Sequence, residues 1–318
     1  PGVVRFDLGG WTSVGRGARP LNVYLLEGEQ PALVGAGHPA TTRALTDALR
    51  EHGVDAAHIH RIICGSWEAA TLGGATAFPS ADLLAASLDF VQPHHWNDWL
   101  DARRAAAAAL SDQIAQRVES WDADAVAAYM GERFPPVTNH LDLVPVRSGQ
   151  TIAAADLTLE AVAAPGTQPE HLMFWEPQAG LLFCGDLTCG GLPARVERIE
   201  DYIITLERAM QLQPKWLLPS SGAPSPRAMP TLRRMLSFCN NFLSNAPTTL
   251  TGGKTLLEFV DADLGHQPDH PAEYLEAAED RLPFLEELVS ARMIKAQGDG
   301  LDRRYGIDVE SPRTDFNI

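Results

Sequence analysis

Apolar residues in the first part of the chain alternate between short strand-like runs and one helical period. Residues 22–26 and 32–34 are short apolar runs rich in β-forming residues, separated by a polar turn segment. Residues 39–52 carry apolar side chains at the spacing of an amphipathic helix, and residues 61–64 form an apolar run typical of a buried strand. This succession of strand, helix and strand predicts an α/β layer fold.

The pattern changes twice in the middle of the chain. Residues 80–135 are dominated by Ala and Leu, which favours two or three helices inserted into the layer fold and ended by Pro135-Pro136. Residues 143–187 return to strand-like runs, with a hairpin turn signal at residues 176–180. A helix near residues 199–212 follows, so the strands on both sides of the insertion are expected to build one core.

The last part of the chain is predicted to be mostly helical. Helical periodicity begins near residue 226, and residues 270–295 predict a pair of helices split at Pro283. The turn Gly298-Asp299-Gly300 then leads to a strand at residues 304–307. Helix, strand, glycine turn and strand together predict a winged-helix-like shape.

Composition narrows the range of partners. Lys and Arg total 25 against 41 Asp and Glu, and the formal net charge of −16 repels the phosphate backbone of nucleic acids. The sequence has no uninterrupted apolar run long enough to span a bilayer, so neither a nucleic-acid partner nor a membrane partner is expected. The four cysteines form no C-x-x-C pair, which favours a reduced, cytoplasmic protein.

Five segments resemble, in their order and spacing, those of the metallo-β-lactamase superfamily. They are residues 22–39, 61–63 with Gly73-Gly74, 164–175, 180–187 and 217–222. A less specific resemblance relates residues 250–307 to the winged-helix appendage of some hydrolases in that superfamily. The resemblance implies an α/β fold of the αββα sandwich type in residues 1–225, with a helical insertion at about 80–135, and a helical C-terminal extension in residues 226–318.

The metal-ligand positions of that family carry almost none of the family's ligands in this chain. In the family, an H-x-H-x-D-H motif, two further histidines and a bridging aspartate bind two zinc ions that activate a water molecule. The matching positions here hold Ser66, Glu68, Ala70, Thr71, Thr167, Asp186 and Ser221. The bridging aspartate is kept at Asp186, and Glu68 still offers an oxygen donor. Two carboxylates alone cannot make a tight zinc site, so the sequence predicts no metal and no other cofactor.

Glu68 and Asp186 are the candidate catalytic residues. If both carboxylates face one pocket, the pair could carry out acid/base chemistry. Each also has a structural alternative: Glu68 lies at a predicted helix start, where an anion interacts favourably with the helix dipole, and Asp186 lies at a strand end, where it could accept backbone N–H bonds.

Small polar side chains at the former ligand positions would leave a polar pocket. We therefore expect the hydroxyl groups at these positions to contact a substrate, with an aromatic contact from Trp67. The cluster His94-His95-Trp96 lies in the predicted insertion, which could fold over the pocket as a lid. The candidate substrate-binding residues are Ser66, Trp67, Thr71, His94, His95, Thr167 and Ser221.

The resemblance implies hydrolysis of an ester, thioester or lactone as the family's reaction. With the metal site lost, we expect a protein that binds a small molecule in the former active-site cleft and acts as a metal-independent hydrolase or lyase. The alternative is a non-catalytic pseudoenzyme that binds or regulates a partner, such as an active paralogue. The sequence leaves the oligomeric state open, although a homodimer is common in the family.

Overall fold

Two β-sheets form the centre of the molecule in the computed structural model, which describes residues 2–87, 96–119, 121–135, 142–193, 196–268 and 270–307. The first sheet has the order β1-β2-β3-β4-β5-β6. Its strands are β1 (Val3–Asp7), β2 (Asn22–Leu26), β3 (Ala32–Val34), β4 (Arg61–Cys64), β5 (Asp82–Ala86) and β6 (Leu143–Val146). The pairs from β1 to β3 are antiparallel, and those from β3 to β6 are parallel.

The second sheet has the order β11-β10-β9-β8-β7, and β12 pairs with β10 in parallel. Its strands are β7 (Thr151–Ala154), β8 (Leu157–Ala163), β9 (Leu172–Glu176), β10 (Leu181–Cys189), β11 (Leu192–Pro193) and β12 (Trp216–Ser221). The burial of β8 alternates at its start, whereas β2, β9 and most of β10 are buried without alternation. Strands that are covered on both faces read as continuous apolar runs, which explains the sequence pattern.

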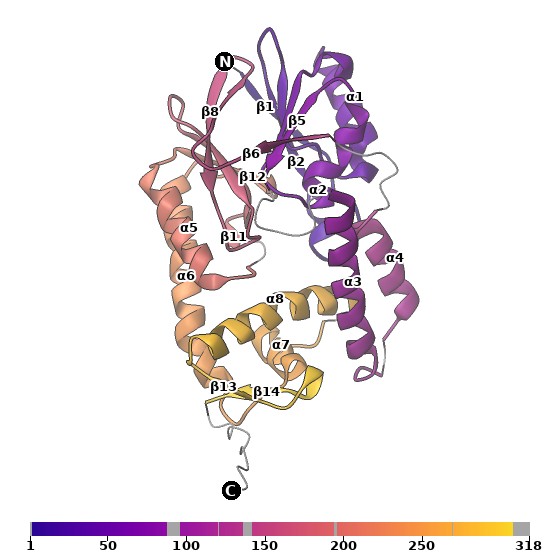
Figure 1. Cartoon of the computed structure of the whole chain (residues 1–318), viewed down its shortest axis with the longest axis vertical. Coiled ribbons are helices and arrows are strands. Elements are labelled where there is room, and N and C mark those ends of the chain that lie inside the picture. The colour runs from indigo at the N-terminus through magenta and orange to yellow at the C-terminus, as the bar shows by residue number, and fades with distance from the viewer. Residues whose placement is uncertain are drawn as a thin grey trace, which may run out of the picture.

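Helices cover the outer faces of the two sheets and continue below them (Figure 1). The α-helices are α1 (Thr42–Glu51), α2 (Ala69–Leu72), α3 (Trp96–Ala115), α4 (Ala123–Arg133), α5 (Ile199–Gln211), α6 (Ala228–Thr249), α7 (Leu256–Leu264) and α8 (Pro271–Ser290). The short 3-10 helices are η1 (Gly15–Ala18), η2 (Pro39–Thr41), η3 (Ala56–His58), η4 (Gly73–Ala77) and η5 (Gly300–Asp302). A small antiparallel pair, β13 (Lys295–Gln297) and β14 (Arg304–Gly306), follows α8.

This architecture confirms the predicted α/β fold with two sheets, outer helices and a helical C-terminal region. The predicted insertion contains α3 and α4 in its described part, but its first residues form β5 of the first sheet. No helix of the described residues is long and apolar enough to cross a membrane.

The predicted break at Pro283 is wrong, because α8 continues through this residue. A proline inside a helix removes one backbone hydrogen bond and strains the preceding turn. Here buried side chains flank the proline on both sides, with Leu275 and Ala278 before it and Phe284 and Leu285 after it. Burial of this continuous apolar face favours an uninterrupted helix over a break.

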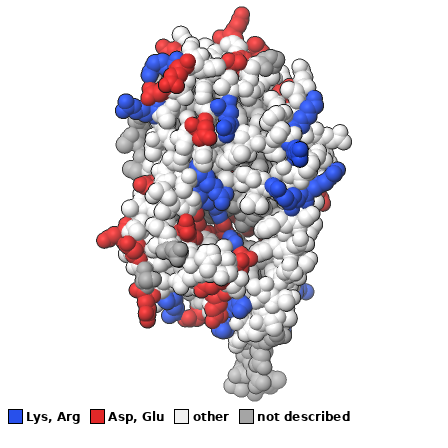
Figure 2. Space-filling view, turned by 180° about the vertical axis from the view of Figure 1, so that it is seen from behind, with Lys and Arg blue, Asp and Glu red and all other residues white. Residues whose placement is uncertain are grey.

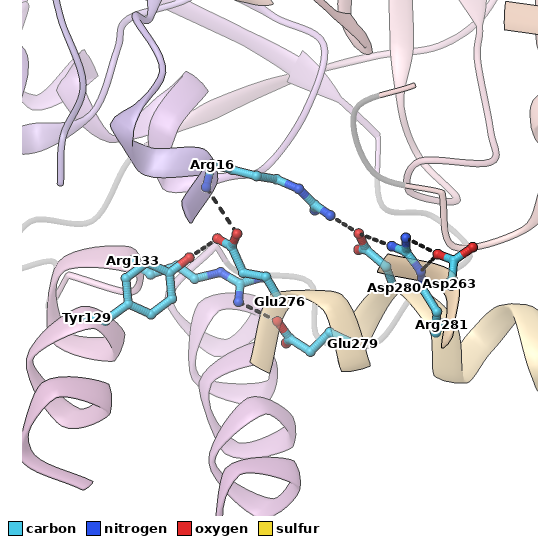
Figure 3. A network of polar contacts seen from close by, with 8 residues as sticks. All are labelled: Arg16, Tyr129, Arg133, Asp263, Glu276, Glu279, Asp280 and Arg281. Atoms are coloured by element: carbon cyan, nitrogen blue, oxygen red, sulfur yellow. Dashed lines mark hydrogen bonds and ion pairs between the residues drawn. The ribbon is translucent and has the colours of Figure 1, made fainter. Parts of the chain in front are cut away.

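The N-terminal half of α8 presents a row of carboxylates to residues from distant parts of the chain (Figure 3). The side chain of Asp280 forms an ion pair with Arg16, which belongs to η1. Arg133, at the end of α4, donates to Glu279 at 2.5 Å. Burial lowers the pKa of the Arg133 guanidinium, but the adjacent carboxylate of Glu279 outweighs this effect, so its pKa lies above the ordinary value.

Glu276 is the third member of this row, which we call the α8 carboxylate row (Glu276, Glu279 and Asp280). It accepts hydrogen bonds from the hydroxyl group of Tyr129 and, at 3.0 Å, from the backbone N–H of Arg16. Gly15 lets the chain pass close by, because its φ is +59° and a Cβ atom there would lie 2.6 Å from a Glu276 carboxylate oxygen. These contacts fix α8 against η1 and α4.

We predict that Arg133→Met lowers the free energy of unfolding by about 3–5 kcal/mol, because it removes the buried cation that pairs with Glu279 at 2.5 Å. Chemical denaturation followed by circular dichroism measures the loss. The double variant Arg133→Met/Glu279→Gln removes both charges and should lose less than the single variant.

A matched control is Arg50→Met, which removes an arginine from an exposed ion pair with Asp47 on α1. This change should cost less than about 1 kcal/mol, because water screens exposed pairs. Equal losses in Arg133→Met and Arg50→Met would contradict the proposed importance of the α8 carboxylate row.

Candidate functional site

A cavity of about 110 Å³ lies where β10 and β12 end and α8 crosses below them. We call it the polar cavity. Its lining combines arginines, carboxylates, hydroxyl groups and an amide with one indole ring. The lining residues are Trp11, Arg16, Arg19, Leu21, Glu68, Ala70, Arg133, Thr167, Gln168, Asp186, Cys189, Ser220, Ser221 and Glu276.

Asp186, within β10, lines the polar cavity, and only one of its two carboxylate oxygens accepts a hydrogen bond from the described residues. The hydroxyl group of Ser220, on the neighbouring strand β12, donates to its Oδ1 atom. Its Oδ2 atom is buried and has no hydrogen-bond partner among the described residues. A buried acceptor in this state costs about 1–3 kcal/mol unless another group satisfies it.

His171 fixes the backbone of Asp186. Its Nδ1–H donates to the carbonyl of Ala164 at 3.1 Å, and its Nε2 accepts the backbone N–H of Asp186 at 3.2 Å. Burial lowers the pKa of His171, in keeping with a neutral ring that donates from one nitrogen and accepts at the other. Gly185 makes the contact possible, since a Cβ atom there would lie 2.5 Å from Nε2 and its φ is +52°.

Two further polar atoms of the lining are buried without a partner in the described structure. They are Thr167 Oγ1 and Gln168 Oε1, which both belong to the loop between β8 and β9. Both residues are almost fully buried, at 1% and 2% exposure. Native proteins leave few buried polar atoms unsatisfied, so three such atoms in the lining of one cavity indicate a place for a polar ligand.

Glu68 also lines the cavity, at the N-terminal end of α2, but its carboxylate is engaged. Gln168 donates to it at 2.9 Å, and Arg103 of α3 approaches to 3.7 Å. Arg103 also pairs with Glu197 at 2.7 Å. Burial lowers the pKa of Arg103, but the attraction of Glu68 and Glu197 raises it above the ordinary value. Arg103 therefore remains a cation beside Glu68.

The remaining hydroxyl candidates occupy two different places. Ser221 lines the polar cavity. Ser66 donates to Thr71 at 3.1 Å, so these two buried hydroxyl groups bind each other. Thr71 lines a smaller hollow of about 30 Å³ that shares Ser220 with the polar cavity.

The structure places Trp67 away from the polar cavity. Its indole N–H donates to the carbonyl of Ala86 at 2.8 Å, and its ring packs at 6.4 Å from that of Trp99 on α3. The site candidates His94 and His95 lie outside the described residues.

Several charged and aromatic lining residues are missed by the sequence analysis, among them Trp11, Arg16, Arg19, Arg133 and Glu276. They come from η1 and its flanks, the end of α4, and α8, which are far apart in the chain. No local motif joins these segments. The glycine-bordered arginines of residues 15–19 are the one visible signal, because glycines admit the positive φ that a close approach requires.

The described residues contain no group of three or more His, Cys, Asp or Glu side chains that could hold a metal ion. All four cysteines are buried and carry free thiols. Burial raises the pKa of the Cys184 thiol to about 12 and that of Cys239 to about 11, so neither is a ready thiolate at neutral pH.

An aromatic stack borders the polar cavity. The ring of Trp11 lies between those of His38, at 4.9 Å, and Tyr129, at 5.8 Å. His38 accepts the backbone N–H of Ala40 and bonds through Nε2 to the carbonyl of Glu132 at 2.8 Å. Burial lowers its pKa to about 4, so the ring is neutral at pH 7.

We predict that His38 makes stability fall with acidity. The folded protein keeps His38 neutral down to about pH 4, while the unfolded chain takes up its proton near pH 6.5, so the free energy of unfolding decreases as pH falls through this window. The contribution of His38 is about 2 kcal/mol between about pH 7 and pH 5.

Denaturation of His38→Gln across this window measures the effect. The variant should be less stable at neutral pH but should show a shallower decline toward acid. His58→Gln, at an exposed site on η3, serves as the control and should keep the full decline. A decline in His38→Gln as steep as in wild type would show that His38 is not its source.

The comparisons with known proteins agree with this architecture. A model of the Metallo-beta-lactamase superfamily matches residues 80–221. A metallo-beta-lactamase family protein from Thermus thermophilus superposes with a TM-score of 0.76 at 18% identity, covering 96% of this chain and 98% of that one. A beta-lactamase domain protein from Burkholderia ambifaria gives a TM-score of 0.70 at 18% identity, covering 96% and 91%. At such identities the likeness concerns the fold alone.

Sequence similarity to curated proteins is confined to a short segment. A hydroxyacylglutathione hydrolase from Legionella pneumophila (strain Corby) is 32% identical over 69 residues, which are 22% of this chain and 25% of that hydrolase. The chain therefore spans about a quarter of the length of this relative. The family model thus matches the middle of this chain, and the solved structures share its two-sheet fold, so the chain is similar to the metallo-β-lactamase superfamily.

Proposed function

We propose that this chain binds a small polar molecule in the polar cavity, without the two-zinc centre of that superfamily. The observation that carries the proposal is the buried Oδ2 atom of Asp186, which has no partner among the described residues. A carboxylate oxygen only accepts hydrogen bonds, so a ligand that satisfies it must bring an N–H or O–H donor. Thr167 Oγ1 beside the same cavity can accept or donate a second bond.

The donors at this site suit a two-zinc centre poorly. Zinc takes imidazole, thiolate or carboxylate ligands that converge at about 2 Å. Among the seven positions that match the family's ligands, only Asp186 and Glu68 carry such a group. The Glu68 carboxylate already accepts from Gln168 and faces Arg103, and the hydroxyls of Ser66 and Thr71 bind each other. The residues present at these positions therefore do not fit a two-zinc centre.

The charges of the lining also favour a polar ligand over an apolar one. Three arginines and three carboxylates surround the cavity. Arg16 and Arg133 are engaged with the α8 carboxylate row. Arg19 is exposed, and the described part of the chain gives it no ion-pair partner. A ligand with an anionic group could pair with Arg19 at low desolvation cost.

Catalysis by this site would depend on Asp186. Glu68 and Asp186 line the same cavity, as acid/base chemistry requires, but only Asp186 has an oxygen without a partner in the described structure. A metal-independent hydrolase or lyase acting on an ester, thioester or lactone would use this oxygen as proton acceptor. The similarity to a hydroxyacylglutathione hydrolase favours a thioester as the first substrate to test.

We predict that the purified protein holds far less than one metal ion per chain, even after incubation with zinc, manganese or iron. Inductively coupled plasma mass spectrometry measures this content. A superfamily member that carries the H-x-H-x-D-H motif, treated in parallel, should retain its zinc. One tightly held ion per chain of this protein would overturn the metal-free part of the proposal.

We predict that Asp186→Asn weakens ligand binding, because the amide replaces an acceptor-only group with one that also donates. Ligand-observed NMR with a set of small hydroxy and amino acids provides the measurement. Compounds that bind wild type should lose at least about tenfold in affinity for the variant. Asp302→Asn makes the same chemical change at a side chain that is 74% exposed, and should bind like wild type.

The same variants separate binding from turnover. Two results together would favour the hydrolase. Wild-type protein should hydrolyse a hydroxyacylglutathione thioester in the presence of a chelator, and the rate should fall about 100-fold or more in Asp186→Asn and in Glu68→Gln. Binding without turnover would favour the non-catalytic alternative. Unchanged binding and turnover in both variants would contradict the assignment of this cavity as the site.

A further inference from the structure

A second hollow of about 210 Å³ lies beside the polar cavity and is mostly apolar. We call it the apolar groove. Its walls come from β11, the start of α5, α6, α7 and α8. The apolar residues that line it are Leu192, Pro193, Val196, Ile199, Phe238, Phe242 and Phe284.

The polar cavity and the apolar groove share the same two walls. On one side, Cys189 of β10 lines the polar cavity, and its register partner on β11, Leu192, lines the groove. On the other side, Glu276 of α8 lines the polar cavity, and Asp280, four residues later, lines the groove. Four residues correspond to about one helical turn, or about 6 Å along the axis. The two hollows therefore follow each other along α8.

Arg16 marks the boundary between the two hollows. Its backbone N–H binds Glu276 on the side of the polar cavity, and its guanidinium group pairs with Asp280 on the side of the groove (Figure 3). Arg281, also in the groove, binds Asp263 through two nitrogen atoms, at 2.9 and 2.5 Å. The charged side chains at the groove thus pair with one another. The apolar wall is therefore the surface that a ligand would contact.

Large apolar side chains of the groove remain in contact with water. Leu192 is 52% exposed and Phe238 is 51% exposed. The Phe238 ring stacks on Phe242 at 6.3 Å with an interplanar angle of 4°, and Phe242 lies 4.5 Å from Phe284. Covering apolar surface of this kind is favourable, and a contiguous exposed patch next to a polar site is typical of a ligand-binding groove.

We infer that the ligand of the polar cavity is an amphiphile: a hydroxycarboxylic acid with an alkyl tail that lies in the apolar groove. This inference rests on the proposed function of the polar cavity. The ligand's hydroxyl group donates to Asp186 Oδ2, its carboxylate pairs with Arg19, and its tail passes Arg16 and covers Leu192 and Phe238.

Isothermal titration calorimetry with three compounds tests the assignment of head and tail. The probes are 3-hydroxyoctanoate, 3-hydroxybutyrate, which has the same head and almost no tail, and octanoate, which has the tail without the hydroxyl group. We expect 3-hydroxyoctanoate to bind at least about tenfold more tightly than either of the others. Equal affinities for 3-hydroxyoctanoate and 3-hydroxybutyrate would overturn the role of the groove.

Two variants assign the contacts to the groove. The double variant Leu192→Ser/Phe238→Ser should lower the affinity for 3-hydroxyoctanoate to that for 3-hydroxybutyrate, and should leave the latter unchanged. Ile204→Ser, which replaces another exposed apolar residue on α5 (49% exposed), is the matched control and should bind like wild type. Because these side chains are exposed, the variants should keep the wild-type circular dichroism spectrum.

Failure of this inference is distinguishable from failure of the proposed function. If 3-hydroxybutyrate binds and loses affinity in Asp186→Asn, but the longer tail adds nothing, the polar cavity stands and the amphiphile is wrong. If octanoate binds as tightly as 3-hydroxyoctanoate and Asp186→Asn changes neither, the head-group assignment is wrong. A dimer in light scattering that dissociates in Leu192→Ser/Phe238→Ser would show that a second copy covers the groove, and would also overturn the inference.

Discussion

Two arginines, Arg16 and Arg133, hold the C-terminal helix α8 against the two-sheet core. Arg16 comes from the loop between β1 and β2 and Arg133 from the end of α4, and both meet carboxylates on one face of α8. Transfer of a guanidinium group out of water costs several kcal/mol unless a carboxylate faces it. A shift of α8 by one turn would separate Arg133 from Glu279, so these pairs define the register of the helix as well as its contact. Every feature of the candidate site that involves α8 depends on this register.

The ion pairs between these arginines and α8 also determine which charges face the polar cavity. The cations that line the polar cavity are guanidinium groups, and they lie beside carboxylates from both the core and α8. Basic and acidic side chains are also interspersed on the face of the molecule seen in Figure 2, where neither sign forms a continuous patch. On this face the charges are thus interspersed, while local pairing gives the cavity its polarity. Asp186 differs from the other carboxylates that line the cavity, because its carboxylate accepts from the hydroxyl group of Ser220 rather than from an arginine.

Local sequence patterns predict the strands of the sheets, but they predict only some of the residues that line the polar cavity. Strand β10 begins with an apolar run at residues 181–184, and Asp186 follows this run inside the same strand, so the local pattern indicates the positions of both. The position of Trp67 in the loop predicts a contact in the polar cavity. In the structure, however, its indole N–H donates to the carbonyl of Ala86. Periodicity cannot show which side a loop residue will face. The roles of Arg16 and Glu276 depend on a contact between residues 260 positions apart, which no local pattern encodes.

The proposed ligand site depends on the position of α8. One face of α8 supplies Glu276 to the polar cavity and Asp280 to the apolar groove, so both hollows exist only while the helix is docked. A ligand that contacts both the β10–β11 hairpin and α8 binds the docked state alone, and must therefore stabilise it by an amount set by its concentration and affinity. The reverse also holds: a change that loosens the α8 carboxylate row weakens ligand binding without touching the ligand. The C-terminal region thus forms a wall of both the polar cavity and the apolar groove.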